Sequence, residues 1–357
     1  MSRVFPLFLV FVSILLLSKL SFHYLLSYAE LSSFLWSILN KREIKQNKYD
    51  VLILGDSQIL SGLHPLLLEK KTQKKILYFP RPSEQPEGIY LLLQDFQKKG
   101  FVFKTLIFNI SPLHASENYF TKTHRSLAKN FDSFHIRFYT DSDLRKFYFK
   151  EKGDSLYYLI SHMFPLLRLN GSPGSELKII PLSKTLNPNH KRTLELLNSP
   201  FFGELHIYYS QNLFLQEQLP KNGYYWNWGH FRTEELHCIP TQEKELNPAV
   251  ATAFLKPRKS AVEMWNKIIN TAKKNNIHVQ LISIPFSSSA EEIIHPQGRI
   301  DPFIHAVLVL KNQFGNSLLH EIPESLFVKG EYNDFIHPNT CGMLKITDEL
   351  AGLLDML

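Results

Sequence analysis

Two short segments, one early and one late in this 357-residue chain, carry side chains that could act together as a nucleophile, a general base and a supporting carboxylate. The early segment is Gly55-Asp56-Ser57, directly after the apolar run Val51–Leu54. The late segment is Asp334-Phe335-Ile336-His337-Pro338-Asn339. A serine hydroxyl attacks an acyl carbonyl when a histidine takes its proton and a carboxylate orients that histidine. The chemistry that these residue types predict is therefore acyl transfer through a covalent acyl-enzyme.

Ser57 stands at the expected junction between a strand and a helix. Gly55 permits a tight turn there, because it has no Cβ to clash with the backbone. In the first turn of a helix, backbone N–H groups and the helix dipole stabilise negative charge, so the N–H of Ser57 is a candidate donor to an oxyanion. The alternative interpretation is that Ser57 only caps the helix, a position that serine favours.

The Asp-x-x-His pattern of the late segment is not specific by itself, since Asp132-Ser133-Phe134-His135 repeats it. The late copy differs because it follows the last predicted strand, is trailed by Pro338-Asn339 and Gly342, and opens the last predicted helix. These features favour His337 as the general base and Asp334 as the carboxylate that supports it. In a chain with 15 histidines, the alternatives are a surface histidine and a turn-forming aspartate.

Strands and helices are predicted to alternate on either side of an irregular middle region. The predicted strands are Val51–Leu54, Lys75–Phe79, Thr105–Ile110, His278–Ile284 and a short one around Leu318–Phe327. The predicted helices are Ser57–Lys71, Glu87–Lys99, Arg258–Asn275, Pro302–Phe314 and Thr340–Leu357. This alternation is typical of a parallel sheet covered by helices on both faces. We therefore predict a flavodoxin-like three-layer α/β/α fold with a central parallel five-stranded sheet, whose ligands bind at the carboxyl ends of the strands.

Residues 112–257 interrupt the alternation within a predicted domain that spans 48–357. A structureless loop of this length is uncommon in a compact domain, so we predict a large, mostly helical insert or lid. Tyr225, Trp226 and Trp228 in this insert are candidate substrate-binding residues, because aromatic faces can stack on sugar rings. The alternative is that they form a hydrophobic plug between the lid and the core.

Residues 1–40 are predicted to anchor the chain in a membrane. The run Val4–Leu17 is almost wholly apolar, and apolar and aromatic residues continue through Leu20–Leu39. The first run alone is shorter than the ~20 residues of a bilayer-spanning helix, but Lys19 can extend its charge to the interface. We expect an uncleaved signal anchor with a transmembrane helix, a membrane-proximal helix and an extracytoplasmic domain; a cleaved signal peptide is the alternative. The basic run 41–48 opposes this orientation, because positive residues favour the cytoplasmic side.

Charge and cysteine content exclude several classes of protein. The formal net charge is +7, and the scattered lysines and arginines do not form the broad basic face of a nucleic-acid-binding protein. The only cysteines, Cys238 and Cys341, lack the spacing of metal ligands, so we predict no metal site and no cofactor. They either form one disulfide in an oxidising compartment or remain two unpaired thiols.

Gly55-Asp56-Ser57 after the first strand, together with Asp334-x-x-His337-Pro338-Asn339 before the last helix, resembles the SGNH (GDSL-type) hydrolase superfamily. The resemblance implies that Ser57 is the nucleophile and that His337 acts as general base and then as general acid. Asp334 would orient His337 and stabilise its protonated form. The flavodoxin-like sheet is also what this superfamily implies.

The resemblance covers residues 50–111 and 258–357 and leaves the insert unexplained. Members of the superfamily take further oxyanion donors from a glycine after the second strand and an asparagine after the third. The corresponding segments differ in this chain, where the candidates beside Ser57 are Gly88, Asn109 and Ser111. The anchor and the insert resemble those of membrane-anchored members that modify envelope polymers, such as the alginate O-acetylation proteins and the D-alanine transfer protein of teichoic acids, and of a spirochaete family of anchored proteins of unknown function.

Two functions of different classes follow from these observations. The first is a membrane-anchored serine esterase or O-acyltransferase, periplasmic or at the cell surface, that acts on an envelope glycan or lipid; a transferase would need an integral membrane protein to deliver its acyl group. Hydrolysis and transfer share the acyl-enzyme and differ in whether water or a hydroxyl group attacks it. The second is a catalytically inactive envelope protein that uses the fold as a binding scaffold, because fold alone does not establish activity.

Overall fold

The computed structural model describes residues 4–25, 48–81, 83–116, 135–149, 153–168, 238, 258–294 and 301–357. These residues fall into two compact units. One unit contains a parallel sheet with its flanking helices. The other contains α1 (Val4–Leu25) and the helices between residues 135 and 168.

The sheet has five parallel strands in the order β2-β1-β3-β4-β5. The strands are β1 (Val51–Leu54), β2 (Ile76–Tyr78), β3 (Thr105–Asn109), β4 (His278–Ser283) and β5 (Leu319–Glu321). Every residue of β1, β2 and β3 is buried, as the mostly apolar sequences of strands covered on both faces require. The predicted five-stranded parallel sheet is therefore confirmed, and its strand order is the one found in flavodoxin-like sheets.

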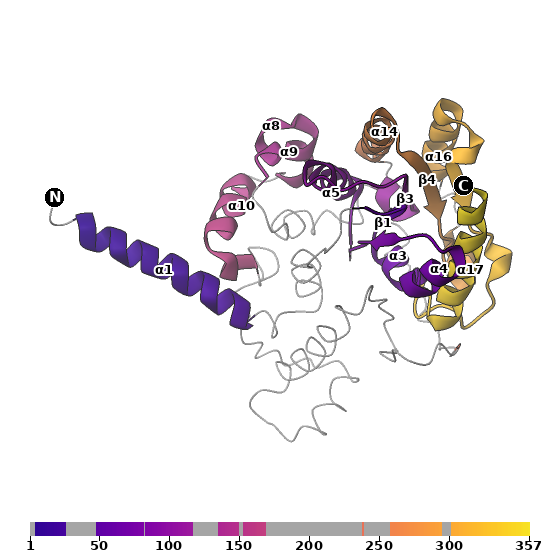
Figure 1. Cartoon of the computed structure of the whole chain (residues 1–357), viewed down its shortest axis with the longest axis horizontal. Coiled ribbons are helices and arrows are strands. Elements are labelled where there is room, and N and C mark those ends of the chain that lie inside the picture. Colours follow the sequence, from indigo (N-terminus) through magenta and orange to yellow (C-terminus); the bar gives the residue numbers. More distant parts are fainter. Residues whose placement is uncertain are drawn as a thin grey trace, which may run out of the picture. The chain divides into compact units, whose positions relative to one another are not determined.

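Helices cover both faces of the sheet in two groups whose members contact one another. The first group is α5 (Pro86–Lys98), α14 (Lys259–Lys274) and α16 (Asp301–Phe314), with the short α6 (Pro112–Ala115) beside them. The second group is α3 (Ser57–Gly62), α4 (Pro65–Thr72) and α17 (Thr340–Met356). Figure 1 shows the two groups on opposite sides of the strands. Helices therefore flank the sheet as the sequence predicts.

Three elements differ from the sequence predictions. The helix predicted over Ser57–Lys71 is divided into α3 and α4, because Pro65 lacks an N–H and begins a new helix instead of continuing the first. The strand expected around Leu318–Phe327 is wrong beyond β5, since the chain turns into a 3-10 helix, η7 (Glu324–Leu326). An additional helix, α15 (Ser288–Ile294), follows β4 where no element was predicted.

The two ends of the predicted insert meet beside the sheet. The backbone N–H of Arg258 donates to the carbonyl of Ala115 at 2.7 Å. The guanidinium of Arg258 pairs with Glu87 and donates to Oε1 of Gln85 at 2.8 Å, which ties the returning chain to the start of α5. Ala115 and Arg258, which are 143 positions apart in the sequence, are therefore neighbours beside the sheet.

The second unit has an aromatic core among α8 (Arg137–Thr140), α9 (Ser142–Tyr148) and α10 (Asp154–Met163). The ring centroid of the buried Phe138 lies 4.7 Å from that of Tyr148 and 4.8 Å from that of Tyr158, both edge to face. Such pairs add packing energy beyond the area that they bury. Among the residues that the structure describes, no helix combines the length and the apolar character that crossing a membrane requires.

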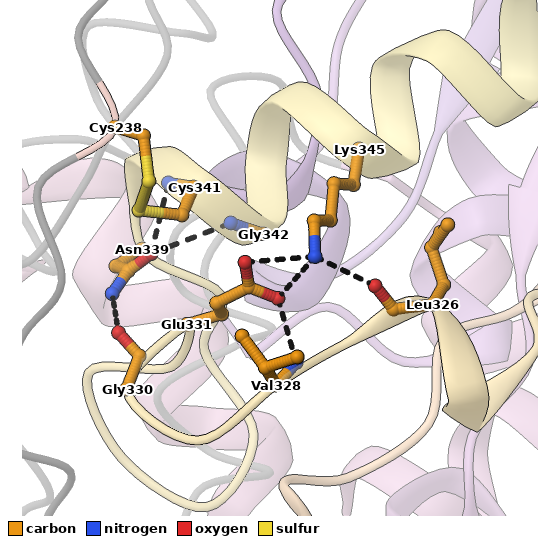
Figure 2. Close-up of a disulfide and its surroundings, with 9 residues drawn as sticks. All are labelled: Cys238, Leu326, Val328, Gly330, Glu331, Asn339, Cys341, Gly342 and Lys345. Atoms are coloured by element: carbon orange, nitrogen blue, oxygen red, sulfur yellow. Dashed lines mark hydrogen bonds and ion pairs between the residues drawn. A yellow bond between two sulfur atoms is a disulfide. The ribbon is translucent and has the colours of Figure 1, made fainter.

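A disulfide joins Cys238 to Cys341, so of the two alternatives for the cysteines the structure contains the bonded one (Figure 2). Cys341 lies in the first turn of α17, where its N–H and that of Gly342 donate to Oδ1 of Asn339, the N-cap residue. Cys238 belongs to the predicted insert. The bond therefore fastens the insert to the helix that begins just after His337.

We predict that this disulfide makes a large contribution to the free energy of unfolding, because it closes a loop across a sequence separation of 103 residues. Chain entropy gives roughly 4–5 kcal/mol for a loop of this size. Urea unfolding of the wild type with and without reductant should show a loss of this order. The double variant Cys238→Ser/Cys341→Ser cannot form the bond. With or without reductant, its free energy of unfolding should therefore equal the low value of the reduced wild type. Equal wild-type stability in both, with the bond verified as reduced, would contradict the prediction.

Candidate active site

Ser57, His337 and Asp334 are brought together beyond the carboxyl end of β1. The Oγ of Ser57 lies 2.8 Å from Nε2 of His337. On the other side of the ring, Nδ1 of His337 lies 2.8 Å from Oδ2 and 3.0 Å from Oδ1 of Asp334. When Nδ1–H is donated to Asp334, Nε2 is left as an acceptor for the proton of Ser57. The three side chains thus have the relative positions of a nucleophile, a general base and an orienting carboxylate.

The turn before Ser57 is held by Asp56, which is the N-cap residue of α3. Oδ1 of Asp56 accepts from the N–H of Gln58 at 2.8 Å, so the capping role considered for Ser57 belongs to its neighbour. Gly55 has room for no side chain, since a Cβ there would lie 2.6 Å from Oδ1 of Asn109. Each residue of Gly55-Asp56-Ser57 therefore has its own structural role. Gly55 allows the close approach of Asn109, Asp56 caps α3, and Ser57 directs its hydroxyl toward His337.

The loop that carries Asp334 and His337 is held by local hydrogen bonds. Oδ1 of Asp334 accepts from the N–H of Ile336 and from the N–H of His337, both at 2.9 Å. The carbonyl of His337 accepts from the N–H of Asn333 at 2.9 Å, and Asn339 ends the loop by capping α17. The carboxylate of Asp334 cannot turn away from the imidazole without losing these backbone bonds.

An ion pair between Glu331 and Lys345 stabilises the chain that precedes this loop (Figure 2). Nζ of Lys345 lies 2.8 Å from the carboxylate of Glu331 and donates to the carbonyl of Leu326 at 2.8 Å. Nδ2 of Asn339 donates to the carbonyl of Gly330 at 2.6 Å. These contacts join α17 to the chain on the amino-terminal side of Asp334, so the aspartate–histidine loop is anchored at both ends.

The pKa of Asp334 is lowered from its ordinary value of 3.8. Burial alone would raise it, but the hydrogen bond and the charge of His337 outweigh burial, with help from the N–H groups of Ile336 and His337. Asp334 therefore stays a carboxylate at neutral and mildly acidic pH. In that form it can stabilise a positive charge that develops on His337 during a reaction.

Gly88, a predicted oxyanion donor, has its N–H in a contact within the protein. Its N–H already donates to the carbonyl of Gln85 at 2.9 Å, in the first turn of α5. A Cβ at Gly88 would lie 1.8 Å from Oε1 of Glu84. The physical reason for a glycine here is therefore the close approach of a buried carboxylate, and the donor is used within the helix.

Asn109 and Ser111, the other predicted oxyanion donors, are both fully buried. The amide of Asn109 is engaged on both sides by Asp56, to which Nδ2 donates at 2.8 Å and from whose N–H Oδ1 accepts at 3.1 Å. Ser111 is fully buried at the N-cap of α6, and its Oγ has no hydrogen-bond partner within the described part of the chain. Of the predicted oxyanion donors, only the N–H of Ser57 is carried by the nucleophile turn itself.

Sequence reasoning missed a buried cluster of charged residues beneath this turn: Arg81, Glu84, Glu87, His114 and Arg258. Each of them lies close after a strand or at the start of a helix. A parallel sheet gathers such positions at one edge, which was the only signal that could have found them. The sequence could not predict which of these residues form pairs, because the paired residues come from different elements.

The remaining site predictions concern aromatic residues and metals. Tyr225, Trp226 and Trp228 lie outside the described residues. Within the described ranges, no group of three or more His, Cys, Asp or Glu side chains could hold a metal ion.

Comparisons with known proteins give no assignment for this chain: no protein-family model matches it, and no curated protein matches it at a significant level. Its function has to be argued from the geometry of the site.

We predict that Asp334→Asn lowers stability more at neutral than at acidic pH. Because the folded-state pKa is lowered, the stabilisation by the carboxylate is present above the unfolded value of 3.8 and is lost as the pH falls through the folded value. Weakening the charge-assisted bonds should cost about 1–3 kcal/mol at neutral pH. Urea unfolding of the wild type and the variant, at neutral pH and well below the unfolded pKa, measures the difference in their free energies of unfolding. A difference that does not become smaller in acid would refute the prediction.

We also predict that Gly55→Ala is destabilising by about 1–3 kcal/mol, because it overpacks the contact with Asn109. Gly352→Ala in α17 is the matched control, since a Cβ there meets nothing within 4 Å. In this exposed helical position alanine should add about 0.5–1 kcal/mol. Thermal or urea unfolding of the two variants should move in opposite directions, and a neutral Gly55→Ala would show that the turn can relax.

Proposed function

We propose that this protein is a serine esterase or O-acyltransferase that works through an acyl-enzyme on Ser57. The observation that carries the proposal is the continuous chain of contacts from Ser57 Oγ through the His337 ring to Asp334, at 2.8 Å on each side of the imidazole. A histidine placed between a serine hydroxyl and a partly buried carboxylate can move a proton in both directions.

The reaction would proceed in two halves. Ser57 Oγ attacks the carbonyl carbon of an ester while Nε2 of His337 takes its proton, and the resulting oxyanion is held by backbone N–H groups that include that of Ser57. His337 then gives the proton to the leaving oxygen, and the acyl group remains on Ser57. In the second half, His337 takes a proton from water or from an acceptor hydroxyl, which releases the acyl group as an acid or as a new ester.

We propose that the protein is a member of the SGNH hydrolase superfamily. Gly55-Asp56-Ser57 after the first strand, the Asp334 and His337 loop before the last helix and a sheet with β1 between β2 and β3 support this assignment. The differences lie at Gly88 and Asn109, whose donors are used in other contacts. The two segments of the proposed triad fit the superfamily, while the donors of Gly88 and Asn109 have other partners.

We further propose that residues 1–40 attach the protein to a membrane, with the site outside the cytoplasm. The large apolar side chains of α1 that are exposed support this: Phe5, Leu7, Phe8, Leu9, Val10, Phe11, Ile14, Leu16, Leu17 and Leu20. A disulfide between the insert and α17 also favours an oxidising compartment. An ester on an envelope glycan or lipid would be the substrate there, and a transferase would take its acyl group from an integral membrane protein.

The second candidate is an inactive envelope protein that uses the fold for binding. The observation that favours it is that two candidate oxyanion donors already have partners: Nδ2 of Asn109 donates to Asp56, and the N–H of Gly88 donates within α5. One missing donor typically lowers kcat by about 100- to 1,000-fold, which is a large loss but not a complete one. Only a test of Ser57 reactivity separates the two candidates.

We predict that a fluorophosphonate probe labels the wild type and that Ser57→Ala abolishes the labelling, because the probe reacts with a serine activated by a base. His337→Ala should lower the labelling rate by a factor on the order of 10,000. Intact-protein mass spectrometry measures the label and assigns it to Ser57. Release or transfer of acetate from isolated envelope polymers, compared between wild type and Ser57→Ala, then distinguishes hydrolysis from transfer.

Ser61→Ala is a suitable control, since Ser61 is a buried serine of α3 whose Oγ donates to the carbonyl of Ser57 at 2.8 Å. It should keep the label on Ser57. A correctly folded wild type that takes no label would refute the enzyme proposal and favour the scaffold.

A further inference from the structure

Beneath the turn that carries Ser57, Asp56 and His114 form a second aspartate–histidine pair. Nε2 of His114 lies 3.1 Å from Oδ2 of Asp56, with side-chain exposures of 0% and 4%. A ring nitrogen this close to a carboxylate must carry a proton, because two lone pairs at that distance would repel each other. His114 is therefore a close polar partner of Asp56, at ion-pair distance but without the alignment of a hydrogen bond, although it lies in α6 and takes no part in the proposed reaction steps.

The other contacts of Asp56 join it to the backbone of α3 and to the side chain of Asn109. Its Oδ1 accepts from Nδ2 of Asn109 and from the N–H of Gln58, both at 2.8 Å. Its own N–H donates to Oδ1 of Asn109 at 3.1 Å. Burial alone would raise the pKa of Asp56, but His114, Gln58 and Asn109 together hold it below its ordinary value. Asp56 is thus a buried carboxylate whose polar partners come from three different elements.

Further buried charges continue this arrangement away from the turn. The N–H of Arg81 donates to the carbonyl of Gly55 at 2.9 Å, and the guanidinium of Arg258 donates to the carbonyl of His114 at 3.4 Å. The acidic partners complete two further ion pairs: Arg81–Glu84 and Arg258–Glu87. The segments that follow β1, β2 and β3 are therefore joined to one another and to the start of α14 by backbone hydrogen bonds and by contacts of charged side chains.

We propose that His114 is a positioning residue for the nucleophile: through its close polar contact with Asp56 it keeps this carboxylate in the orientation that caps α3 and directs Ser57 toward His337. The proposal rests on the serine chemistry proposed above. Without this partner, the carboxylate would reorient, and the turn would move with it. Its unshared charge would also oppose an oxyanion that forms near the N–H of Ser57. The loss should therefore fall on bond formation at Ser57 rather than on substrate binding.

A double-mutant cycle tests the pair. His114→Leu removes the donor at similar volume, while Asp56→Asn removes the charge and keeps a favoured capping residue. We expect His114→Leu to lower the saturating rate of fluorophosphonate labelling about 100-fold, as a small misplacement of a reacting group can. In the Asp56→Asn background the same change should cost less than about tenfold, because no charge is left unpaired. The probe concentration for half-maximal rate should stay the same, and His114→Gln, which restores a donor, should recover most of the rate.

Hydrogen–deuterium exchange of the peptide covering residues 51–63 gives a readout that does not need activity. We expect His114→Leu to accelerate exchange there and to leave the peptide covering β4 unchanged. His320→Leu is the matched control, since Nε2 of His320 lies at the same 3.1 Å from Oε1 of Glu349, between β5 and α17. Because that pair is partly exposed, its loss should change labelling by less than about twofold.

The outcomes separate the two proposals. Equal costs of His114→Leu in both backgrounds, or unchanged exchange at 51–63, would overturn the positioning role even if the wild type is labelled. An unlabelled wild type would count against the serine chemistry, and with it the catalytic consequence of the pair. Where His114→Leu does not fold, His114→Met replaces it in the same cycle, since a flexible apolar side chain fills the space with less strain.

Discussion

The site depends on the packing of the last helix, α17, against α3, the helix that begins at Ser57. Gly62 at the end of α3 allows this approach, because a Cβ there would lie 3.3 Å from Cδ1 of Ile346 and 3.6 Å from Cγ of Pro338. Next to this contact, the N–H of His64 donates to the buried Oγ1 of Thr347 at 3.0 Å. These contacts bring the two ends of the sheet unit together. The 2.8 Å contact between Ser57 and His337 is a consequence of that packing.

The buried charges beneath the nucleophile turn are costly in stability terms. Removing ions from water is expensive, and a buried ion pair often contributes less than apolar residues of the same volume would. Their placement in this molecule is therefore better explained by geometry than by stability. Asp56 holds the N–H of Gln58, Asn109 holds the N–H of Asp56, and the N–H of Arg81 holds the carbonyl of Gly55. A turn held by these contacts keeps the direction of the Ser57 hydroxyl.

The insert is attached at more than one point to the same region. Its two ends are joined by the hydrogen bond from Arg258 to Ala115, and Cys238 is bonded to the first turn of α17. Glu331 and Lys345 hold the loop before that turn (Figure 2). The disulfide and the Glu331–Lys345 pair therefore both act on the start of α17, next to the loop that carries Asp334 and His337.

The sequence by itself determined the strand–helix alternation, the parallel sheet and the two segments that meet at its edge. These depend on local signals: short runs of buried apolar residues, glycine in a tight turn, and residues that begin or end helices. The divided helix at Pro65 was also readable in principle, since a proline cannot continue a helix. The catalytic candidates Ser57, Asp334 and His337 came from the same local patterns.

Only the tertiary structure decided what each polar side chain contacts. Nothing local tells that Asn109 faces Asp56, that Glu84 fills the space beside Gly88, or that His114 is the histidine paired beneath the nucleophile turn. Residue type gives the ability to donate or accept, but the partner is set by which strand ends lie side by side in the sheet. The same holds for the disulfide, because two cysteines can bond only where the fold brings them within reach.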